Sequence, residues 1–249
     1  MFDLTGRVAL VTGAGQSVGA GVAATLAEAG ATVAVNDLHA DRAQVTVESI
    51  SADGRRAMVV PFDVTDDAAV TEGVTAVTRE LGSLDILVNN AGIAEGSSAK
   101  FVADDSFNPE YWTKWVDLNL HGVIRCCKAV LPGMVERHFG RIVTISSGAG
   151  TQGLAIGMSA YAAGKGGAIS FMRHLAMETA KDGITANSLA LGMMDNTAGR
   201  VMPEQVRKLN PVGRLGTGRD VGTAVVWLAA EGSWVTGQTI GVNGGAATT

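Results

Sequence analysis

Residues 12–19 read Thr12-Gly13-Ala14-Gly15-Gln16-Ser17-Val18-Gly19, and this stretch decides the fold of the chain. It follows the strand-like run Arg7–Thr12 and opens the amphipathic segment Val18–Ala29. Glycines at such a turn let the backbone approach a phosphate, while the helix start supplies amide donors and a positive dipole end. The turn therefore predicts a site for the pyrophosphate of a dinucleotide. An ordinary turn between a strand and a helix is the alternative.

Short runs rich in Val, Ile, Leu and Ala alternate with longer amphipathic segments along the whole chain. The predicted strands are Arg7–Thr12, Thr32–Asn36, Arg56–Phe62, Ile86–Asn89, Arg141–Ser146, Thr185–Ala190 and Thr239–Val242. The predicted helices are Val18–Ala29, Asp41–Ala52, Ala68–Leu81, Pro109–His138, Ala160–Lys181 and Val221–Ala230, with a short one near Glu204–Lys208. This alternation predicts a parallel sheet joined by right-handed crossovers. We therefore expect an α/β fold: a single Rossmann-type doubly wound domain over residues 1–249, with a seven-stranded parallel sheet flanked by helices.

The composition narrows the class of protein. The chain has 249 residues, 47% hydrophobic and 17% charged, so it can bury a sizeable core. Its formal net charge is −5 and no basic run is visible, so we expect no nucleic-acid partner. No apolar stretch is long enough to span a membrane and the start does not resemble a signal peptide, so we expect a cytoplasmic protein without a membrane partner. The adjacent Cys126 and Cys127 are expected to be buried free thiols, and no metal site is predicted.

A carboxylate follows the second predicted strand, in Val35-Asn36-Asp37. A carboxylate at this place can accept hydrogen bonds from both ribose hydroxyls of an adenosine, and it would repel a 2′-phosphate. The next residues, Leu38 and His39, include no Arg or Lys that would offset this repulsion. NAD is therefore favoured over NADP. Asp37 could instead cap the next helix, a role for which Asp41 competes.

Tyr161 and Lys165 are four residues apart, about one helical turn, so a helix would place both on one face. A fixed cation beside a phenol lowers the pKa of the phenol towards neutrality. Tyr161 could then exchange a proton with a substrate oxygen. The spacing alone is common on surface helices, so its meaning depends on the other motifs of the chain.

These motifs occur in one order over essentially the full length. They are Thr12-Gly13-x-x-x-x-x-Gly19, Asp63-Val64, Asn89-Asn90-Ala91-Gly92, Asn119, Ser146-Ser147, Tyr161-x-x-x-Lys165, Asn187, Val235-Thr236-Gly237-Gln238-Thr239 and Val242-Asn243-Gly244-Gly245. With them the chain resembles the short-chain dehydrogenase/reductase family. The resemblance implies a catalytic tetrad of Asn119, Ser147, Tyr161 and Lys165. Tyr161 would act as general acid or base, Lys165 would lower its pKa and hold the nicotinamide ribose, Ser147 would bind the substrate oxygen, and Asn119 would bend its helix and hold a water of the proton relay.

The resemblance also implies a set of residues around the dinucleotide. They are Gly13, Gln16, Ser17, Val18, Gly19, Asp37, Asp63, Val64, Asn90, Ala91, Gly92, Tyr161, Lys165, Gly192, Met193 and Asn196. Asp63 would meet the adenine, Asn90 would pass near the adenosine ribose, and Asn89 would help to hold adjacent strands.

Two positions depart from the family pattern. Ser17 stands where a glycine is usual, and it costs roughly 1 kcal/mol if the residue needs a positive φ. Ser17 could instead cap the helix and touch a phosphate through its hydroxyl. Leu191-Gly192 replaces a usual Pro-Gly, so the base of the lid is expected to be more mobile. The usual threonine nearby falls on Asn196, with Thr197 next to it.

Three segments are expected to line the substrate pocket: Ile93–Asn108, Gly148–Ala160 and Met193–Asn210. The candidate lining residues are Leu154, Ile156, Met158, Met193 and Met194. Their apolar character favours a small apolar secondary alcohol or ketone as substrate, although some of them could pack in the core instead. Trp112 and Trp115 are expected to make core or subunit contacts.

The favoured function is an NAD(H)-dependent oxidoreductase that interconverts a secondary alcohol and a ketone. A reductase of 3-oxoacyl thioesters, on acyl-carrier protein or CoA, is the alternative, and it would predict NADP preference and basic residues at the pocket mouth. A non-catalytic dinucleotide-binding sensor is the second alternative. By resemblance we also expect a homotetramer, with close helix packing at Gly164, Gly166, Gly167 and Ala168.

Overall fold

The computed structural model describes residues 2–92, 107–155, 157–195, 204, 208, 210–230 and 234–248. Seven strands form one sheet: β1 (Val8–Val11), β2 (Thr32–Val35), β3 (Ala57–Val59), β4 (Ile86–Asn89), β5 (Gly140–Ser147), β6 (Ile184–Leu191) and β7 (Thr239–Val242). Their order is β3-β2-β1-β4-β5-β6-β7, and every pairing is parallel. The predicted α/β fold and its seven strands are confirmed.

The chain reverses its direction of travel across the sheet next to β1. From β1 it moves outward through β2 to β3, and then it returns to place β4 on the other side of β1. In open α/β sheets, ligands bind beyond the carboxyl ends of the strands at such a switch point. The glycine-rich turn leaves β1 at this end, so the topology places it at the expected ligand crevice.

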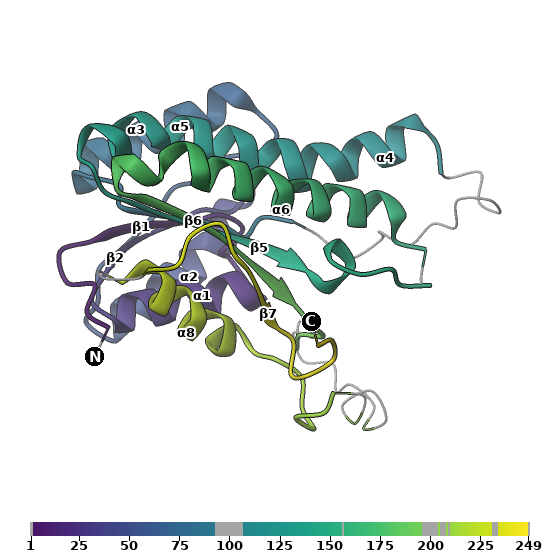
Figure 1. Cartoon of the computed structure of the whole chain (residues 1–249). Helices are drawn as coiled ribbons and strands as arrows, with labels where there is room; N and C mark the ends of the chain where they lie inside the picture. The colour runs from purple at the N-terminus through teal and green to yellow at the C-terminus, as the bar shows by residue number, and fades with distance from the viewer. Residues whose placement is uncertain are drawn as a thin grey trace.

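Helices cover both faces of the sheet (Figure 1). They are α1 (Ser17–Glu28), α2 (Ala40–Ala52), α3 (Asp67–Leu81), α4 (Pro109–Val116), α5 (Gly122–Glu136), α6 (Ser159–Thr179) and α8 (Gly218–Ala229). Figure 1 shows α1, α2 and α8 below the sheet and α3, α4, α5 and α6 above it. The short helix expected near Glu204–Lys208 lies almost wholly outside the described residues.

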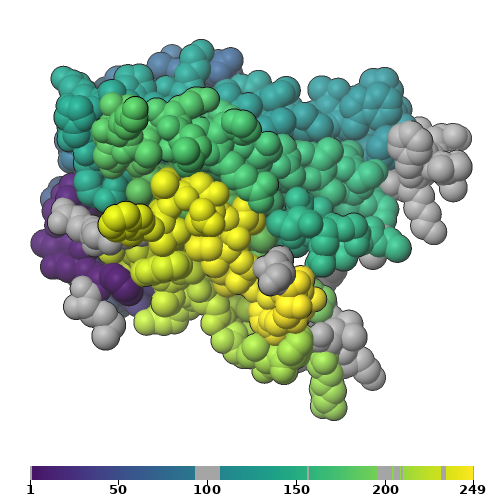
Figure 2. Space-filling model, in the orientation of Figure 1, coloured from purple at the N-terminus to yellow at the C-terminus, as the bar shows by residue number. Residues whose placement is uncertain are grey.

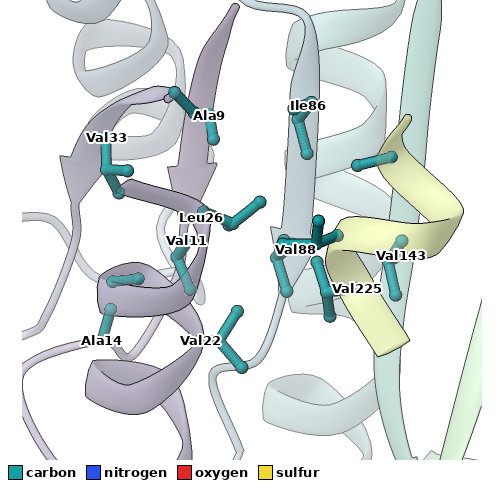
Figure 3. Packing of buried hydrophobic residues seen from close by; sticks show 14 of the residues in the cluster. Ala9, Val11, Ala14, Val22, Leu26, Val33, Ile86, Val88, Val143 and Val225 are labelled. Carbon is teal, nitrogen blue, oxygen red and sulfur yellow. The ribbon is translucent and has the colours of Figure 1, made fainter. Parts of the chain in front are cut away.

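The alternation of side chains along each strand divides the core into two layers. Ala9 and Val11 face α1 and α8, whereas Val8 and Leu10 face the opposite layer. Figure 3 shows Val22 and Leu26 of the first layer near the strand residues that they cover. Because both faces are buried, the strands contain apolar residues at successive positions, which explains why the sequence revealed them.

One predicted helix contains a π-turn at Asn119, where the resemblance implied a bend. Residues 109–138 form α4, a π-helical turn η1 (Asp117–His121) and α5 in place of a single helix. The amide Nδ2 of Asn119 donates to the carbonyl of Trp115, 3.0 Å away, and so takes an acceptor that the helix backbone would otherwise use. Side-chain bonds of this kind bend helices. The break therefore has a local cause at Asn119.

The small residues of α6 pack within the chain. A Cβ on Gly164 would lie 2.9 Å from Asn119 Cβ, and one on Gly167 would lie 3.0 Å from Leu120. Gly166 approaches Gly150 of the turn η2 (Gly148–Gly150), and Ala168 is fully buried in the core. These residues therefore bring α6 against η1 and η2, and a subunit contact through α6 stays a prediction.

Among the described residues, no helix combines the length and the apolar character that crossing a membrane would need.

Candidate active site

The glycine-rich turn folds closely against the end of β4. Gly13 has φ +61°, and a Cβ on it would lie 2.9 Å from the Cα of Ala91. Asn90 donates through Nδ2 to the carbonyls of Thr12 and Gly13, each 2.9 Å away. The Thr12 hydroxyl accepts the amides of Asn90 and Ala91, both at 3.0 Å. Asn90 and Ala91, predicted as ribose neighbours, thus also hold the turn in place.

The start of α1 has amide groups available for an anion. Its N-cap residue, Gln16, makes no side-chain capping bond, and the first turn carries no acidic residue. By contrast, α3 and α4 are capped by Asp66 and Asn108. A helix start without a cap, beside glycines that permit close approach, suits a phosphate group. The residues present therefore fit the pyrophosphate of a dinucleotide.

Ser17, which stands where the family usually has a glycine, adopts a backbone conformation with a positive φ. Its φ is +51°, which lies in the left-handed region that favours glycine. The serine therefore costs roughly 1 kcal/mol of stability relative to glycine at this position. Ser17 is the first residue of α1 and not its N-cap. The alternative in which its hydroxyl caps the helix is therefore wrong. Gln16 and Ser17 are both exposed at this turn, Val18 is partly buried, and Gly19 is buried against the carbonyl of Gly13.

Asp37 is buried, with 6% of its surface exposed, and it holds the glycine-rich turn. Its Oδ2 accepts the Gly15 amide at 3.1 Å, and its Oδ1 accepts the His39 amide at 3.0 Å. The N-cap of α2 is His39, so the alternative role of Asp37 as that cap is wrong. Each carboxylate oxygen keeps a second lone pair, with which it can accept a ribose hydroxyl.

Arg42 is a residue that reasoning along the sequence missed. A Cβ on Gly15 would lie 2.6 Å from the Cβ of Arg42 and 2.7 Å from Oδ2 of Asp37. The chain neighbours of Asp37 include no Arg or Lys. However, the start of α2 brings Arg42 against Gly15 in the glycine-rich turn. Its closeness in the sequence was a signal, since Arg42 follows Asp37 by only five residues, at the start of the next predicted helix.

Asp63 and Val64 follow β3 near the same end of the sheet. The Oδ1 atom of Asp63 accepts both the amide and the hydroxyl of Thr65, each at 2.8 Å, which fixes the carboxylate. Val64 is buried and lies against Gly122, where a Cβ would come within 3.0 Å of it. Asn89 donates to Thr144 Oγ1 of β5 at 3.3 Å, which is the strand-holding role expected for it.

Ser147, Tyr161 and Lys165 come together where β5 ends and α6 begins. The Ser147 side chain lies beside that of Tyr161, close enough to lower the pKa of the phenol. Lys165 is 4% exposed; its Nζ donates to the carbonyl of Ile145 at 2.8 Å and lies 5.9 Å from the centre of the Tyr161 ring. Ser146 points elsewhere, donating to the carbonyl of Lys165 at 3.2 Å. The hydroxyl beside the phenol is therefore that of Ser147, as the spacing predicted.

The pKa values of this pair differ from the sequence expectation. Burial raises the pKa of Tyr161 above its usual 10, against an opposing effect of the Ser147 side chain. Burial also lowers the pKa of Lys165 from 10.5 to about 8. Desolvation disfavours the charged form of each group. Burial therefore sets the direction of both pKa shifts in the chain by itself, and a lowering of the Tyr161 pKa by Lys165 stays a prediction.

Asn119 faces Lys165 across Gly92. Asn119 is fully buried, and its Oδ1 has no hydrogen-bond partner among the described residues. A Cβ on Gly92 would lie 2.7 Å from that Oδ1 and 2.8 Å from Lys165 Nζ. The missing side chain thus leaves a small polar space between an amide oxygen and an ammonium group. A buried acceptor of this kind suits a water of a proton relay.

The end of β6 forms the far border of the site. The Gly192 amide donates to the carbonyl of Val242 at 3.1 Å, and a Cβ on Gly192 would lie 2.7 Å from Asn243. Met193 is exposed and its carbonyl accepts the Gly216 amide at 3.0 Å. Asn196, predicted to touch the cofactor, lies outside the described residues.

The predicted substrate walls are only partly described. Residues 93–106, Ile156 and most of Met193–Asn210 lie outside the described residues. Leu154 and Met193 are exposed, whereas Met158 packs beside Tyr161 and Met194 packs against the main core. Trp115 is buried with its ring 6.4 Å from that of Tyr161, so it is a core residue, as expected.

The two cysteines behave as the sequence predicted. Cys126 and Cys127 are free and buried, and burial raises the pKa of both thiols, that of Cys127 to about 12. In the described part of the chain, no group of three or more His, Cys, Asp or Glu side chains could hold a metal ion.

Known proteins resemble this chain over nearly its full length. The sequence profile described as short chain dehydrogenase matches residues 7–206. The 3-oxoacyl-[acyl-carrier-protein] reductase of Escherichia coli (strain K12) is 38% identical, with 98% of each chain covered. A subunit of (2S)-[(R)-hydroxy(phenyl)methyl]succinyl-CoA dehydrogenase from Thauera aromatica is 34% identical, with the same coverage. The solved structure of a 7α-hydroxysteroid dehydrogenase with NADH and 7-oxo glycochenodeoxycholic acid superimposes with a TM-score of 0.90 at 31% identity, covering 100% of this chain and 97% of the other.

Proposed function

This chain belongs to the short-chain dehydrogenase family of oxidoreductases, which act on CH–OH or carbonyl groups, and on that premise we propose that it interconverts a ketone and a secondary alcohol with NAD(H). The observation that carries the proposal is the meeting of Ser147, Tyr161 and Lys165 beside the switch point of the sheet. A bound nicotinamide dinucleotide would supply the hydride chemistry. The protein must then handle the proton and the charge on the substrate oxygen.

The proton step falls to Tyr161. Its raised pKa keeps the phenol protonated at neutral pH, as a general acid for ketone reduction requires. Ser147 and Tyr161 would donate hydrogen bonds to the same substrate oxygen, which stabilises the charge that develops on it. The Tyr161 proton would pass to that oxygen, and replacement protons would reach Tyr161 through the polar space between Lys165 and Asn119.

The first substrate candidate is a 3-oxoacyl thioester. The sequence argument favoured a small apolar alcohol or ketone, but the names of the curated relatives support this alternative better. The Escherichia coli relative is a reductase of 3-oxoacyl groups on acyl-carrier protein, and the Thauera aromatica relative is a subunit of a dehydrogenase of a CoA thioester. The second candidate is an apolar ketone or alcohol, supported by the hydroxysteroid dehydrogenases among the solved structures.

NAD is the proposed cofactor on the strength of Asp37, against the NADP preference that the thioester candidate by itself predicts. Its buried carboxylate would accept the ribose hydroxyls and repel a 2′-phosphate, and a related structure contains NADH. Arg42 would weaken this repulsion, so NADP use is expected to be low but measurable. Asp37→Asn keeps the shape of the side chain and removes its charge. We expect it to raise the NADPH-to-NADH ratio of kcat/KM; an unchanged ratio would show that the ribose does not meet this residue.

Assembly into a homotetramer also belongs to this proposal. An apolar groove of about 350 Å³ lies between α4 and α6, lined by Phe107, Trp112, Val116, Ser159, Ala160 and Ala163. On another face, β7 lies between α6 and α8 (Figure 2). Large exposed apolar side chains occur nearby, with Met177 on α6, Trp227 on α8 and the 98% exposed Trp234. Light scattering after gel filtration would measure the assembly. We also propose a cytoplasmic location.

One activity screen tests the proposed function. The purified protein is assayed with NADH and with NADPH against acetoacetyl-CoA, a 3-oxoacyl-acyl-carrier protein and a panel of apolar ketones, and in reverse against the alcohols. Turnover of the thioesters with the highest kcat/KM would support the first candidate, and turnover of the free ketones would support the second. Tight dinucleotide binding with no turnover of any substrate would favour the sensor hypothesis and contradict the proposal.

A further inference from the structure

A group of charged side chains spans the outer side of the helix break at η1. Asp117 begins this π-turn, His121 ends it, and Arg125 lies one turn further along α5. The same carboxylate oxygen, Asp117 Oδ1, lies 3.0 Å from Nδ1 of His121 and 2.9 Å from Nη2 of Arg125. Arg125 Nε also lies 3.6 Å from Asp67 Oδ1, at the start of α3. The Asp117 carboxylate, at the start of η1, therefore contacts both the last residue of η1 and a residue of α5.

The break needs such support because a π-turn is an unstable form of helix. Each of its backbone hydrogen bonds spans five residues, one more than in an α-helix. Single π-turns inside α-helices occur frequently at functional sites. Each residue advances an α-helix by 100°, so a return to regular α-helix would rotate Asn119 away from its present direction. The position of Asn119 therefore depends on contacts that keep the extra residue within η1.

The inner side of η1 packs closely against α6. A Cβ on Gly164 would lie 2.9 Å from Asn119 Cβ and 3.0 Å from the carbonyl of Trp115. This close approach limits movement of η1 towards α6, but it does not prevent movement outward. Asp117 and Arg125 lie on the outer side, where they can resist that second movement.

The ion pair is more protected from water than most surface pairs. The side chain of Arg125 is 19% exposed and that of Asp117 is 27% exposed, and Arg125 Nη1 is buried without a partner among the described residues. Fully exposed pairs contribute little, because water and salt screen them. By contrast, the pair between Arg219 and Glu28, which joins α8 to α1, has an arginine that is 70% exposed.

We propose that Asp117, held by Arg125, is a positioning residue that fixes η1 so that Asn119 Oδ1 stays turned towards Lys165. The inference rests on the proposed function, since it assigns Asn119 to the proton path of Tyr161. It predicts that loss of the Asp117 charge slows the proton step and leaves the binding of dinucleotide and ketone intact.

Two variants test this proposal, each with a matched control. Asp117→Asn removes the charge and keeps the shape, and Arg125→Met removes the cation and keeps the stem. Glu28→Gln is the control, because it breaks an ion pair of similar length away from η1. We expect kcat to fall roughly 10-fold in the two variants, within the range that misplaced catalytic groups show. KM and the dinucleotide Kd should change less than twofold, and the solvent deuterium isotope effect on kcat should rise. Arg125→Lys, which keeps the charge, should retain more activity than Arg125→Met.

The outcomes separate this proposal from the proposed function. Wild-type protein that turns over no ketone or alcohol would contradict the proposed function. Hydrogen exchange would then still test whether Asp117 and Arg125 stabilise η1. The amides of residues 115–125 should exchange faster in Asp117→Asn than in wild type or Glu28→Gln. Active wild-type protein, with kcat and isotope effect unchanged in Asp117→Asn, would overturn the role of Asp117. So would a fall in kcat of equal size in Glu28→Gln.

Discussion

The glycine-rich turn after β1 and the polar cluster between η1 and α6 both lie at the carboxyl edge of the sheet, yet different contacts fix them. In the turn, Gly13 and Gly15 lack side chains, so the backbone packs directly against neighbouring residues. In the cluster, buried polar side chains are held by single bonds, as Lys165 is by the carbonyl of Ile145. The first arrangement suits a large ligand that lies on amides, and the second suits a group that must gain and lose a proton. Damage to the two regions should therefore have different effects.

The largest expected effect is on turnover alone. Tyr161→Phe removes the proton donor and keeps the ring, so kcat should fall by about 10³-fold, within the range for general acids. The dinucleotide Kd should stay within twofold, because the turn is untouched. Steady-state kinetics and fluorescence titration measure the two quantities. Tyr111→Phe alters the only other tyrosine of the chain and should leave kcat near wild type. Comparable kcat values in both variants would remove the distinction between the two regions.

A methyl group in the turn should have the opposite effect. In Gly15→Ala the new Cβ would lie 2.6 Å from Arg42 Cβ and 2.7 Å from the Asp37 carboxylate, so the turn must shift. Overpacking of this kind costs about 1–3 kcal/mol, which corresponds to a loss of dinucleotide affinity of roughly 5- to 150-fold. Titration calorimetry measures that loss, and kcat at saturating dinucleotide should change little.

Gly133→Ala is the control for this change. It adds a methyl group within α5, where the nearest atom is the flexible end of Arg137 at 3.1 Å. Its dinucleotide Kd should equal that of the wild type. If Gly15→Ala binds as tightly as this control, the turn does not carry the pyrophosphate.

A smaller effect concerns stability and its dependence on pH. The pKa of Lys165 is about 8 when folded and 10.5 when unfolded, so between these values the unfolded chain binds more protons. The contribution of Lys165 to the free energy of unfolding therefore rises with pH across this window, by roughly 3 kcal/mol. Lys165→Met should be more stable than wild type at pH 7, with the difference shrinking as the pH approaches 10.

Urea unfolding of dinucleotide-free protein at several pH values measures this difference. Lys128→Met replaces an exposed lysine of α5 and corrects for general alkaline effects. A constant difference between Lys165→Met and wild type from pH 7 to 10 would contradict the lowered pKa, and with it the view that burial dominates the catalytic cluster.

The smallest effect is expected at Ser17. Ser17→Gly removes a left-handed side chain at φ +51°, and it should raise the free energy of unfolding by up to about 1 kcal/mol. His138 is the only other described non-glycine residue with a positive φ, at +53°. His138→Gly should give a similar gain, but only Ser17→Gly can alter the dinucleotide Kd. A change of Kd in His138→Gly would show that backbone strain acts beyond the turn.

Much of the fold was predictable because the strands are buried on both faces. Residues 86–89 and 239–242 were predicted with the observed strand bounds, and the other strands differ by at most three residues at an end. Hydrophobic periodicity predicted the helix over 109–138 but not its π-turn, because a side-chain bond from Asn119 to Trp115 leaves no mark on that periodicity; only the resemblance implied a bend at Asn119.

The candidate site was predictable as a set of residue types but not as an electrostatic environment. The order of the motifs identified Ser147, Tyr161 and Lys165, and these residues do meet. Their pKa values depend on how much water reaches them, and no neighbour in the sequence reveals that. The proximity of Arg42 to Gly15, and the joint use of Asp117 by His121 and Arg125, likewise come from helix starts and breaks that the folded chain brings together.

The sequence by itself determined which elements form and which chemical groups the chain carries to the carboxyl edge of the sheet, because burial and backbone freedom act locally through residue type. Only the tertiary structure decided which groups lose their water and which carbonyl holds the Lys165 ammonium. Desolvation and ion pairing depend on distances in space, so they are set when distant segments pack and not before.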